Sequence, residues 1–126
     1  MIDRIEIVAT CTGDDAAAAA IAYSPHVEGK IHAVQLSYVG DDPATTDVTL
    51  ADESDPANES IVSLTDNATD IKIYPRRLLE TNDGTDLTYD GTRKVYGHYV
   101  VHGRLKLTIA QANTGDKITA TVWLEH

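Results

Sequence analysis

The sequence predicts an all-β protein: an antiparallel two-sheet sandwich, jelly-roll-like, with eight or nine short strands. Apolar and polar residues alternate over most of the chain, which is the period of a half-buried strand. The alternating runs are about five residues long, and clusters of Gly, Asp, Asn and Pro separate them. A series of short strands divided by turns is typical of two packed sheets, with the jelly roll as the leading topology.

The first expected strand is "DRIEIVATC", residues 3–11, where Ile5, Ile7, Ala9 and Cys11 share one face. The following runs show the same period with β-branched or polar neighbours suited to strands. Their expected inward residues are Val34, Leu36 and Tyr38; Val48 and Leu50; Val62 and Leu64; and Ile71 and Ile73. A further strand is expected within "KVYGHYVVHG", residues 94–103.

The last two runs have the clearest alternation. In "RLKLTIAQ" the inward residues are Leu105, Leu107 and Ile109, and in "KITATVWLE" they are Ile118, Ala120, Val122 and Leu124. The linker "ANTGD" contains Gly115 between turn-forming residues. This pattern predicts an antiparallel hairpin.

The segment "GDDAAAAAIAYSP" is ambiguous. Asp14 and Asp15 before five alanines suit a capped helix, since alanine has the highest helix propensity. However, Pro25 would limit the helix to about ten residues, a marginal length, and alanines bury little side chain. We expect a strand through about Ala17 to Tyr23.

The length of 126 residues fits a single β-sandwich domain spanning residues 1–126. The formal charge of -10 disfavours nucleic acid as a partner. The N-terminal residues lack the pattern of an export signal, and no segment approaches the roughly 20 apolar residues of a membrane span, so we expect no membrane partner. The single cysteine, Cys11, cannot form an internal disulfide and is expected to pack in the core.

No cofactor, metal or catalytic residue is expected. His98 and His102 are four residues apart, which on one strand separates them by about 13 Å, too far to share a metal ion. The sequence has no nucleophile elbow or phosphate-binding loop, so we expect no enzyme. The segment "NDGTDLTYDG" is read as two turns, Asp83-Gly84 and Asp90-Gly91, with a weak structural Ca²⁺ as the open alternative.

The candidate partner-binding residues are Arg76, Arg77, Tyr96 and Tyr99. Pro75 ends the preceding strand, so "YPRRLLE" is expected to begin as a turn. One arginine could pair with an acidic residue of the same chain, as is common on surfaces. Alternatively, its planar fork could bind a carboxylate of another subunit, with the tyrosines as further contacts.

Three longer stretches resemble small structural proteins of tailed phages, especially head decoration or cement proteins. They are "DDAAAAAIAYSPHVEGKIHAVQLSYVG", "LTDNATDIKIYPRRLL" followed by "LTYDGT", and "YVVHGRLKLTIAQANTGDKITATVWLE". The resemblance implies a non-enzymatic virion component, made in the host cytoplasm, that binds the major capsid protein on the capsid surface and stabilises the assembled head. It also implies a homo-oligomer, often a trimer. It carries over no site residue.

Two other function classes remain open at the level of sequence. A carbohydrate-binding or receptor-binding module would use the same sandwich with exposed aromatic residues, here Trp123 and several tyrosines. A minor tail or head-to-tail component would share the virion context. The host, the number of copies and the loops that contact a partner do not follow from the sequence.

Overall fold

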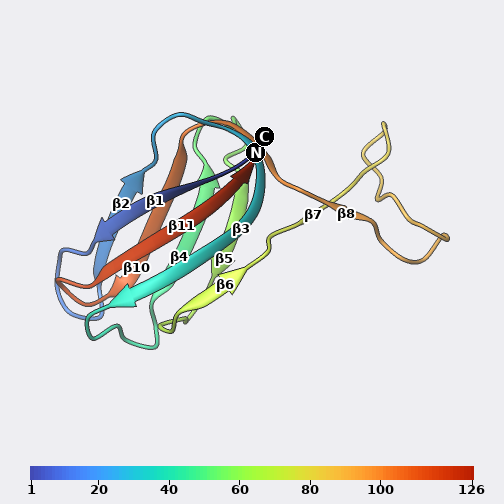
Figure 1. The fold of residues 1–126 in the computed structure, drawn as a ribbon. Coiled ribbons are helices and arrows are strands. Elements are labelled where there is room, and N and C mark those ends of the chain that lie inside the picture. Colours follow the sequence, from blue (N-terminus) through green and yellow to red (C-terminus); the bar gives the residue numbers. More distant parts are fainter.

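The computed structural model describes residues 1–126 and contains two sheets and a projecting arm (Figure 1). The first sheet has the order β1 (Ile2–Thr10), β11 (Lys117–Glu125), β3 (Val27–Val39) and β6 (Ile71–Ile73), and β9 (Val100–Gly103) also pairs with β3. The second sheet has the order β2 (Ala18–Tyr23), β10 (Leu105–Ala112), β4 (Asp47–Asp52) and β5 (Ser60–Leu64). The arm contains β7 (Arg77–Leu78) and β8 (Tyr96–Gly97).

The strand order is that of a jelly roll and confirms the predicted fold class. All pairings are antiparallel. The chain passes from one sheet to the other after β1, β2, β3, β5, β9 and β10, and stays within a sheet from β4 to β5 and, through the arm, from β6 to β9. A five-stranded and a four-stranded sheet linked by such crossings bury one apolar face each against the other.

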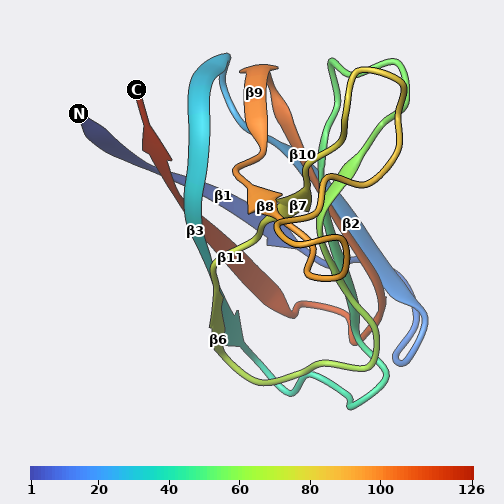
Figure 2. The same cartoon turned by 90° about the vertical axis from the view of Figure 1, so that its right-hand side faces the viewer.

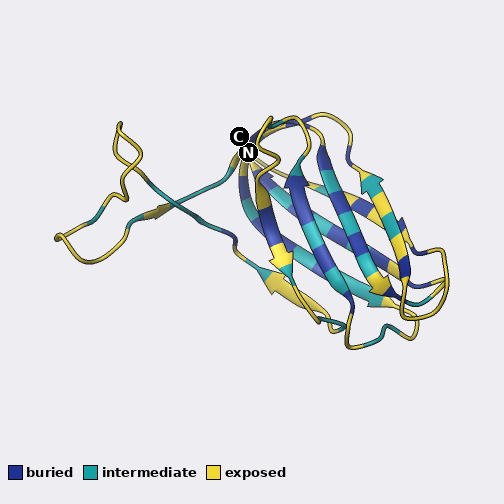
Figure 3. Cartoon of the chain, turned by 180° about the vertical axis from the view of Figure 1, so that it is seen from behind, coloured by how far each residue is buried: buried dark blue, intermediate teal, exposed yellow.

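Alternation along the strands places the core between the sheets, as the banding of buried and exposed residues in Figure 3 shows. The predicted inward residues of the two last runs are buried without exception. Cys11 is also buried, and its burial raises the pKa of the thiol, as expected for a packing residue. The edge strand β6 departs from the prediction, since Ile71 is exposed and Ile73 is half-buried.

The alanine-rich segment forms strand β2 and not a helix, as expected. Ala18 is fully buried, and Lys106 to Ile109 of β10 pair with Tyr23 to Ala20. Small side chains suit this position because Ala20 and Ala22 pack closely against the core cluster. The strand therefore owes its conformation to pairing and packing, which override helix propensity.

The predicted hairpin of the last two runs is wrong. Strand β10 pairs with β2 and β4 in one sheet, while β11 pairs with β1 and β3 in the other. The connecting turn is bound to the end of β1: Gly115 N donates to Cys11 O at 2.9 Å, and Cys11 N donates to Asp116 O at 2.8 Å. The two apolar faces therefore meet across the core, not side by side.

The expected strand at residues 94–103 is divided in two. Tyr96–Gly97 belongs to the arm, and Val100–Gly103 returns to the sandwich. Both β6 and β9 lie antiparallel to β3 in the same direction, with Ile73 opposite Val34 and Val100 opposite Lys30. In effect, one edge strand is interrupted by residues 74–99, and residues 31–33 of β3 lie opposite the interruption.

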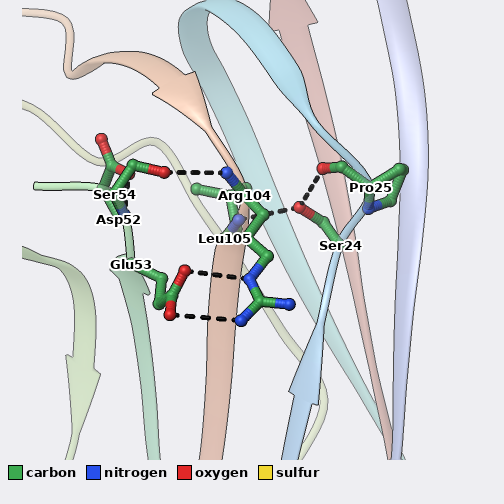
Figure 4. A network of polar contacts seen from close by, with 7 residues as sticks. All are labelled: Ser24, Pro25, Asp52, Glu53, Ser54, Arg104 and Leu105. Atoms are coloured by element: carbon green, nitrogen blue, oxygen red, sulfur yellow. Dashed lines mark hydrogen bonds and ion pairs between the residues drawn. The ribbon is translucent and has the colours of Figure 1, made fainter.

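Polar contacts hold the corner where the chain returns from the arm and enters β10 (Figure 4). Ser54 Oγ accepts from Arg104 N at 3.2 Å, and Ser24 Oγ accepts from Leu105 N at 2.8 Å. The Arg104 guanidinium binds both carboxylate oxygens of Glu53, at 2.9 and 3.2 Å. Gly103, with φ of 150°, is needed here because a Cβ would lie 1.8 Å from Ser54 Oγ.

Candidate interaction surface

The most prominent feature outside the sandwich is the arm, Tyr74–Tyr99, which leaves one edge and extends away from both sheets (Figure 1). Figure 2 views the arm end-on, in front of the sandwich. Its strands β7 and β8 pair with each other, Arg77 opposite Gly97 and Leu78 opposite Tyr96. Beyond them the chain forms two smaller turns. The arm is therefore a long antiparallel excursion from an edge strand.

Backbone hydrogen bonds organise the outer part of the arm. Leu79 N donates to Val95 O at 2.9 Å, Val95 N to Leu87 O at 3.1 Å, and Leu87 N to Leu79 O at 2.9 Å. Each of the three segments around these residues is therefore hydrogen-bonded to the other two. The segments are joined by the predicted Asp-Gly turns, in which Gly84 and Gly91 both have φ of 86°. These bonds give the arm a defined backbone.

The aspartates of these turns are bonded within their own turns. Asp83 Oδ1 accepts from Thr85 N at 3.2 Å and from the hydroxyls of Thr81 and Thr85, and these bonds lower the pKa of Asp83 to about 2. Asp90 Oδ1 accepts from Thr92 N at 3.1 Å and Arg93 N at 2.9 Å, which lowers the pKa of Asp90. Both carboxylates therefore stabilise turns.

The arm has almost no buried residues. Pro75 is the sole buried residue among its 26, and the arm's apolar side chains remain partly or largely exposed. The exposed fractions are 54% for Tyr74, 37% for Leu87, 80% for Tyr89 and 59% for Tyr96. An isolated two-stranded ribbon is marginally stable in water, because little apolar surface is removed from solvent. A partner surface would supply that burial.

The arm also differs from the sandwich in charge. It contains four basic and four acidic residues, so six basic and sixteen acidic residues remain for the sandwich, which carries the whole net charge of -10. Within the arm, Arg93 pairs with Asp90 at 3.3 Å, and Lys94 pairs with Asp86. The arm is therefore a neutral projection on a strongly acidic body.

Arg76 lies at the base of the arm and is bonded within the chain. Its Nη1 donates to His32 O at 3.1 Å and to Pro75 O at 2.8 Å. His32 lies opposite the interruption of the edge strand, so neither β6 nor β9 supplies a hydrogen-bond donor to its carbonyl. On the other side of the gap, Ile31 N donates to Tyr99 O at 2.9 Å. Arg76 thus closes the sheet edge where the arm departs.

Arg77 and the two tyrosines have different surroundings. Arg77 is half-buried on β7, its Nη2 lies 3.7 Å from Glu80 Oε1, and its buried Nε has no hydrogen-bond partner. Tyr99 packs against the core cluster, whereas Tyr96 is largely exposed on β8. Arg77 and Tyr99 line one groove of about 400 Å³ between the arm base and the 52–59 loop. Of the four predicted residues, Tyr96 is the most open to a partner.

His98 and His102 face different neighbours. His102 Nε2 lies 3.0 Å from Glu28 Oε1, while His98 belongs to a group with His32 and Glu125. The two histidines belong to different groups of potential ligands, and the single strand from which their separation was predicted is divided between the arm and β9. Trp123 is half-buried on β11, with Lys72 Nζ 4.5 Å from its ring centre. The structure contains no helix long and apolar enough to cross a membrane.

Comparisons with known proteins identify no family for this chain. No family model and no curated protein matches it. Among solved structures, the crystal structure of FLHE matches with a TM-score of 0.46 and 16% sequence identity, covering 99% of this chain and 98% of that chain. The likeness is too distant to carry an argument about the activity or partners of this chain.

The prediction of a phage head decoration protein is wrong. Neither the family models nor the curated proteins supply a virion relative, and the matching structure named above is FLHE. The three stretches on which the resemblance rested are strands and turns of a jelly roll, a pattern that unrelated proteins share. What stands is the all-β sandwich.

Proposed function

We propose that this chain is a non-enzymatic assembly module that forms homo-oligomers, and that the arm of one copy docks on the sandwich of another. The observation that carries the proposal is the arm itself: 26 residues, one of them buried, with tyrosines exposed on a defined backbone. Exposed aromatic residues on a preformed element are typical of contact residues.

A second copy fits this arm better than a partner that binds through opposite charge. Two sandwiches of this net charge repel each other, but a neutral arm with internally paired charges can approach an acidic body without that cost. Contact through tyrosines and leucines then provides the attraction by removing apolar surface from water.

The docking surface that we propose is the opposite edge of the sandwich, formed by β1 and β2. Each strand has an unpaired edge, since β1 and β2 are the first strands of their sheets. Exposed apolar residues lie along both: Ile2, Val8, Ile21 and Tyr23. An arm on one edge and a receptor on the other make a head-to-tail contact, which gives a closed ring if the rotation between copies closes.

Replacing the arm tests the proposal directly. Residues 74–99 are exchanged for three residues, because three positions of β3, residues 31–33, lie between the partners of Ile73 and Val100. The exchange should join β6 and β9 into one continuous strand. We expect a folded monomer, whereas the parent chain should be an oligomer whose copy number follows from its mass in solution.

Point variants separate the arm's contacts from a general loss of solubility. We expect Tyr89→Ser with Tyr96→Ser to weaken association at least about tenfold, as loss of aromatic contact residues does. The matched control is Val39→Ser, which removes a residue that is 61% exposed at the end of β3. Val8→Glu with Ile21→Glu tests the receptor edge.

Two results would overturn the proposal. One is a parent chain that stays monomeric at concentrations of about 100 µM, far above the dissociation constant of a specific complex. The other is an arm-deleted variant that folds and associates like the parent. Analytical ultracentrifugation gives both masses, and circular dichroism shows that the variants retain their strands.

A further inference from the structure

Two histidines and a glutamate meet on the outer face of the sandwich, beside the strand that returns from the arm. His26 Nε2 lies 3.1 Å from Glu28 Oε1, and His102 Nε2 lies 3.0 Å from the same oxygen. The rings of His26 and His102 are 5.0 Å apart between centroids and nearly perpendicular. All three ligand atoms lie within 4.8 Å of one another.

Strand geometry brings these side chains together. His26 and Glu28 are two residues apart, so they project on the same side of an extended chain. Glu28 is directly opposite His102 in the pairing of β3 with β9. Directly opposed residues of antiparallel strands have neighbouring side chains on one face. The backbone register therefore fixes the convergence of all three groups.

The distances match the edges of a tetrahedral coordination site. Ligands at about 2.0 to 2.1 Å from Zn²⁺ in tetrahedral arrangement are about 3.3 Å apart. The two nitrogen-to-oxygen distances are close to this value. The ligand nitrogens of His26 and His102 lie within 4.8 Å of each other, and closing this separation to about 3.3 Å would complete the third edge of the site.

We propose that His26, Glu28 and His102 form a binding site for a divalent transition-metal ion, with Zn²⁺ as the representative ion. Two imidazole nitrogens and one carboxylate oxygen are ligands suited to zinc and its neighbours, whereas Mg²⁺ and Ca²⁺ prefer oxygen alone. Three protein ligands leave one coordination position for water or another ligand. On binding, each imidazole presents the Nε2 lone pair and holds its proton on Nδ1.

The position of the site gives the ion a mechanical consequence. His26 lies immediately before β3, Glu28 lies at its start, and His102 lies on β9, two residues after the strand resumes from the arm. An ion bound to all three joins these strands and thereby fastens the returning end of the arm. A ligand that binds the folded state alone also stabilises it, so the melting temperature should rise on metal addition.

The test is a zinc titration of tag-free protein by calorimetry, with melting curves in parallel. We expect one Zn²⁺ per chain, no comparable binding of Mg²⁺, and a rise in melting temperature of about 5 °C at saturating metal. Glu28→Gln, His26→Ala and His102→Ala should each weaken zinc binding by about tenfold or more. Anomalous scattering from zinc-soaked crystals would locate the ion.

Two histidine variants serve as controls. His98→Ala removes a member of the second group, His32 with His98 and Glu125. His126→Ala removes a histidine that lines the same shallow groove as His26. Both should bind zinc like the parent. Absence of zinc binding at about 100 µM metal would overturn the proposal, as would variants of His26 and His102 that bind like the parent.

Discussion

At the scale of single residues, the most unusual group is a pair of carboxyls near the start of β11. Asp116 is buried, and its oxygens accept from the amides of Asp41 at 3.1 Å and Asn113 at 3.0 Å. Asp42 lies next to it, and its buried Oδ1 has no partner. Burial, followed by the negative charge of Asp116, raises the pKa of Asp42 from its usual 3.8 to about 6.

This raised pKa predicts a pH dependence of stability. Between pH 3.8 and about 6 the folded protein holds a proton on Asp42 that the unfolded chain has released, so stability falls as the pH rises through this window. Asp42→Asn should therefore raise the melting temperature at pH 7.5 and change it little at pH 4. Thermal melts of parent and variant at both pH values measure the effect, and an equal shift at both would contradict it.

Arg76 illustrates what residue types alone could show about the candidate site. The sequence indicated that two arginines follow a strand-ending proline, but their different contacts depend on an interruption of the sheet edge that no local pattern reveals. The His26-x-Glu28 spacing was also visible in the sequence. Its third member, His102, is found only through the pairing of β3 with β9.

The bond from Arg76 to the His32 carbonyl predicts a stability effect. Arg76→Met keeps the aliphatic stem and removes both hydrogen bonds to backbone carbonyls. We expect a loss of about 1 to 2 kcal/mol in the free energy of unfolding, because a carbonyl at the sheet edge loses its donor. The control is Arg93→Met on the exposed arm tip, which should change stability by less than about 0.5 kcal/mol. Urea unfolding compares the two variants.

At the scale of elements, alternation determined which face of a strand points inward but not which strand lies beside it. This explains how the inward residues of β10 and β11 could be correct while their predicted hairpin was wrong. A short Gly-containing linker suits a hairpin and equally a crossing between sheets. In a jelly roll the last two strands lie in opposite sheets, so the fold class and the hairpin were incompatible predictions.

The buried face of β10 supports a direct test of the core. Leu107 is fully buried between the sheets, so Leu107→Ala leaves a cavity and should cost about 2 to 5 kcal/mol of unfolding free energy. Val39→Ala, at a position 61% exposed, is the control and should cost much less. Equal stability of the two variants in urea unfolding would show that Leu107 is not part of the packed core.

The arm is the element that the sequence described least well. Its two Asp-Gly turns were predicted and are confirmed, because turn chemistry is local. The projection of the arm from the sandwich was not predicted. The edge strand that ends at Ile73 of β6 continues only at Val100 of β9, 27 positions later in the chain. Local alternation carries no information about such a detour.

At the scale of the whole molecule, charge is unevenly divided between a neutral arm and an acidic sandwich. In the proposed oligomer, each arm brings two acidic bodies close together. The contact itself would be apolar, through tyrosine and leucine side chains, because the charged residues of the arm tip are paired internally. Attraction would then come from apolar contact and repulsion from the like charges of the sandwiches. Salt screens the repulsion but not the apolar contact.

Association should therefore strengthen as the salt concentration rises. The screening length falls from about 30 Å at 10 mM salt to about 8 Å at 150 mM, which weakens repulsion between the bodies and leaves the apolar contact intact. We expect the dissociation constant to fall by about tenfold over this range, measured by sedimentation at matched protein concentrations. The arm-deleted variant should remain monomeric throughout. Weaker association in salt would instead mean that arm cations bind acidic groups of the neighbouring copy, and Arg93→Glu with Lys94→Glu would then abolish the oligomer.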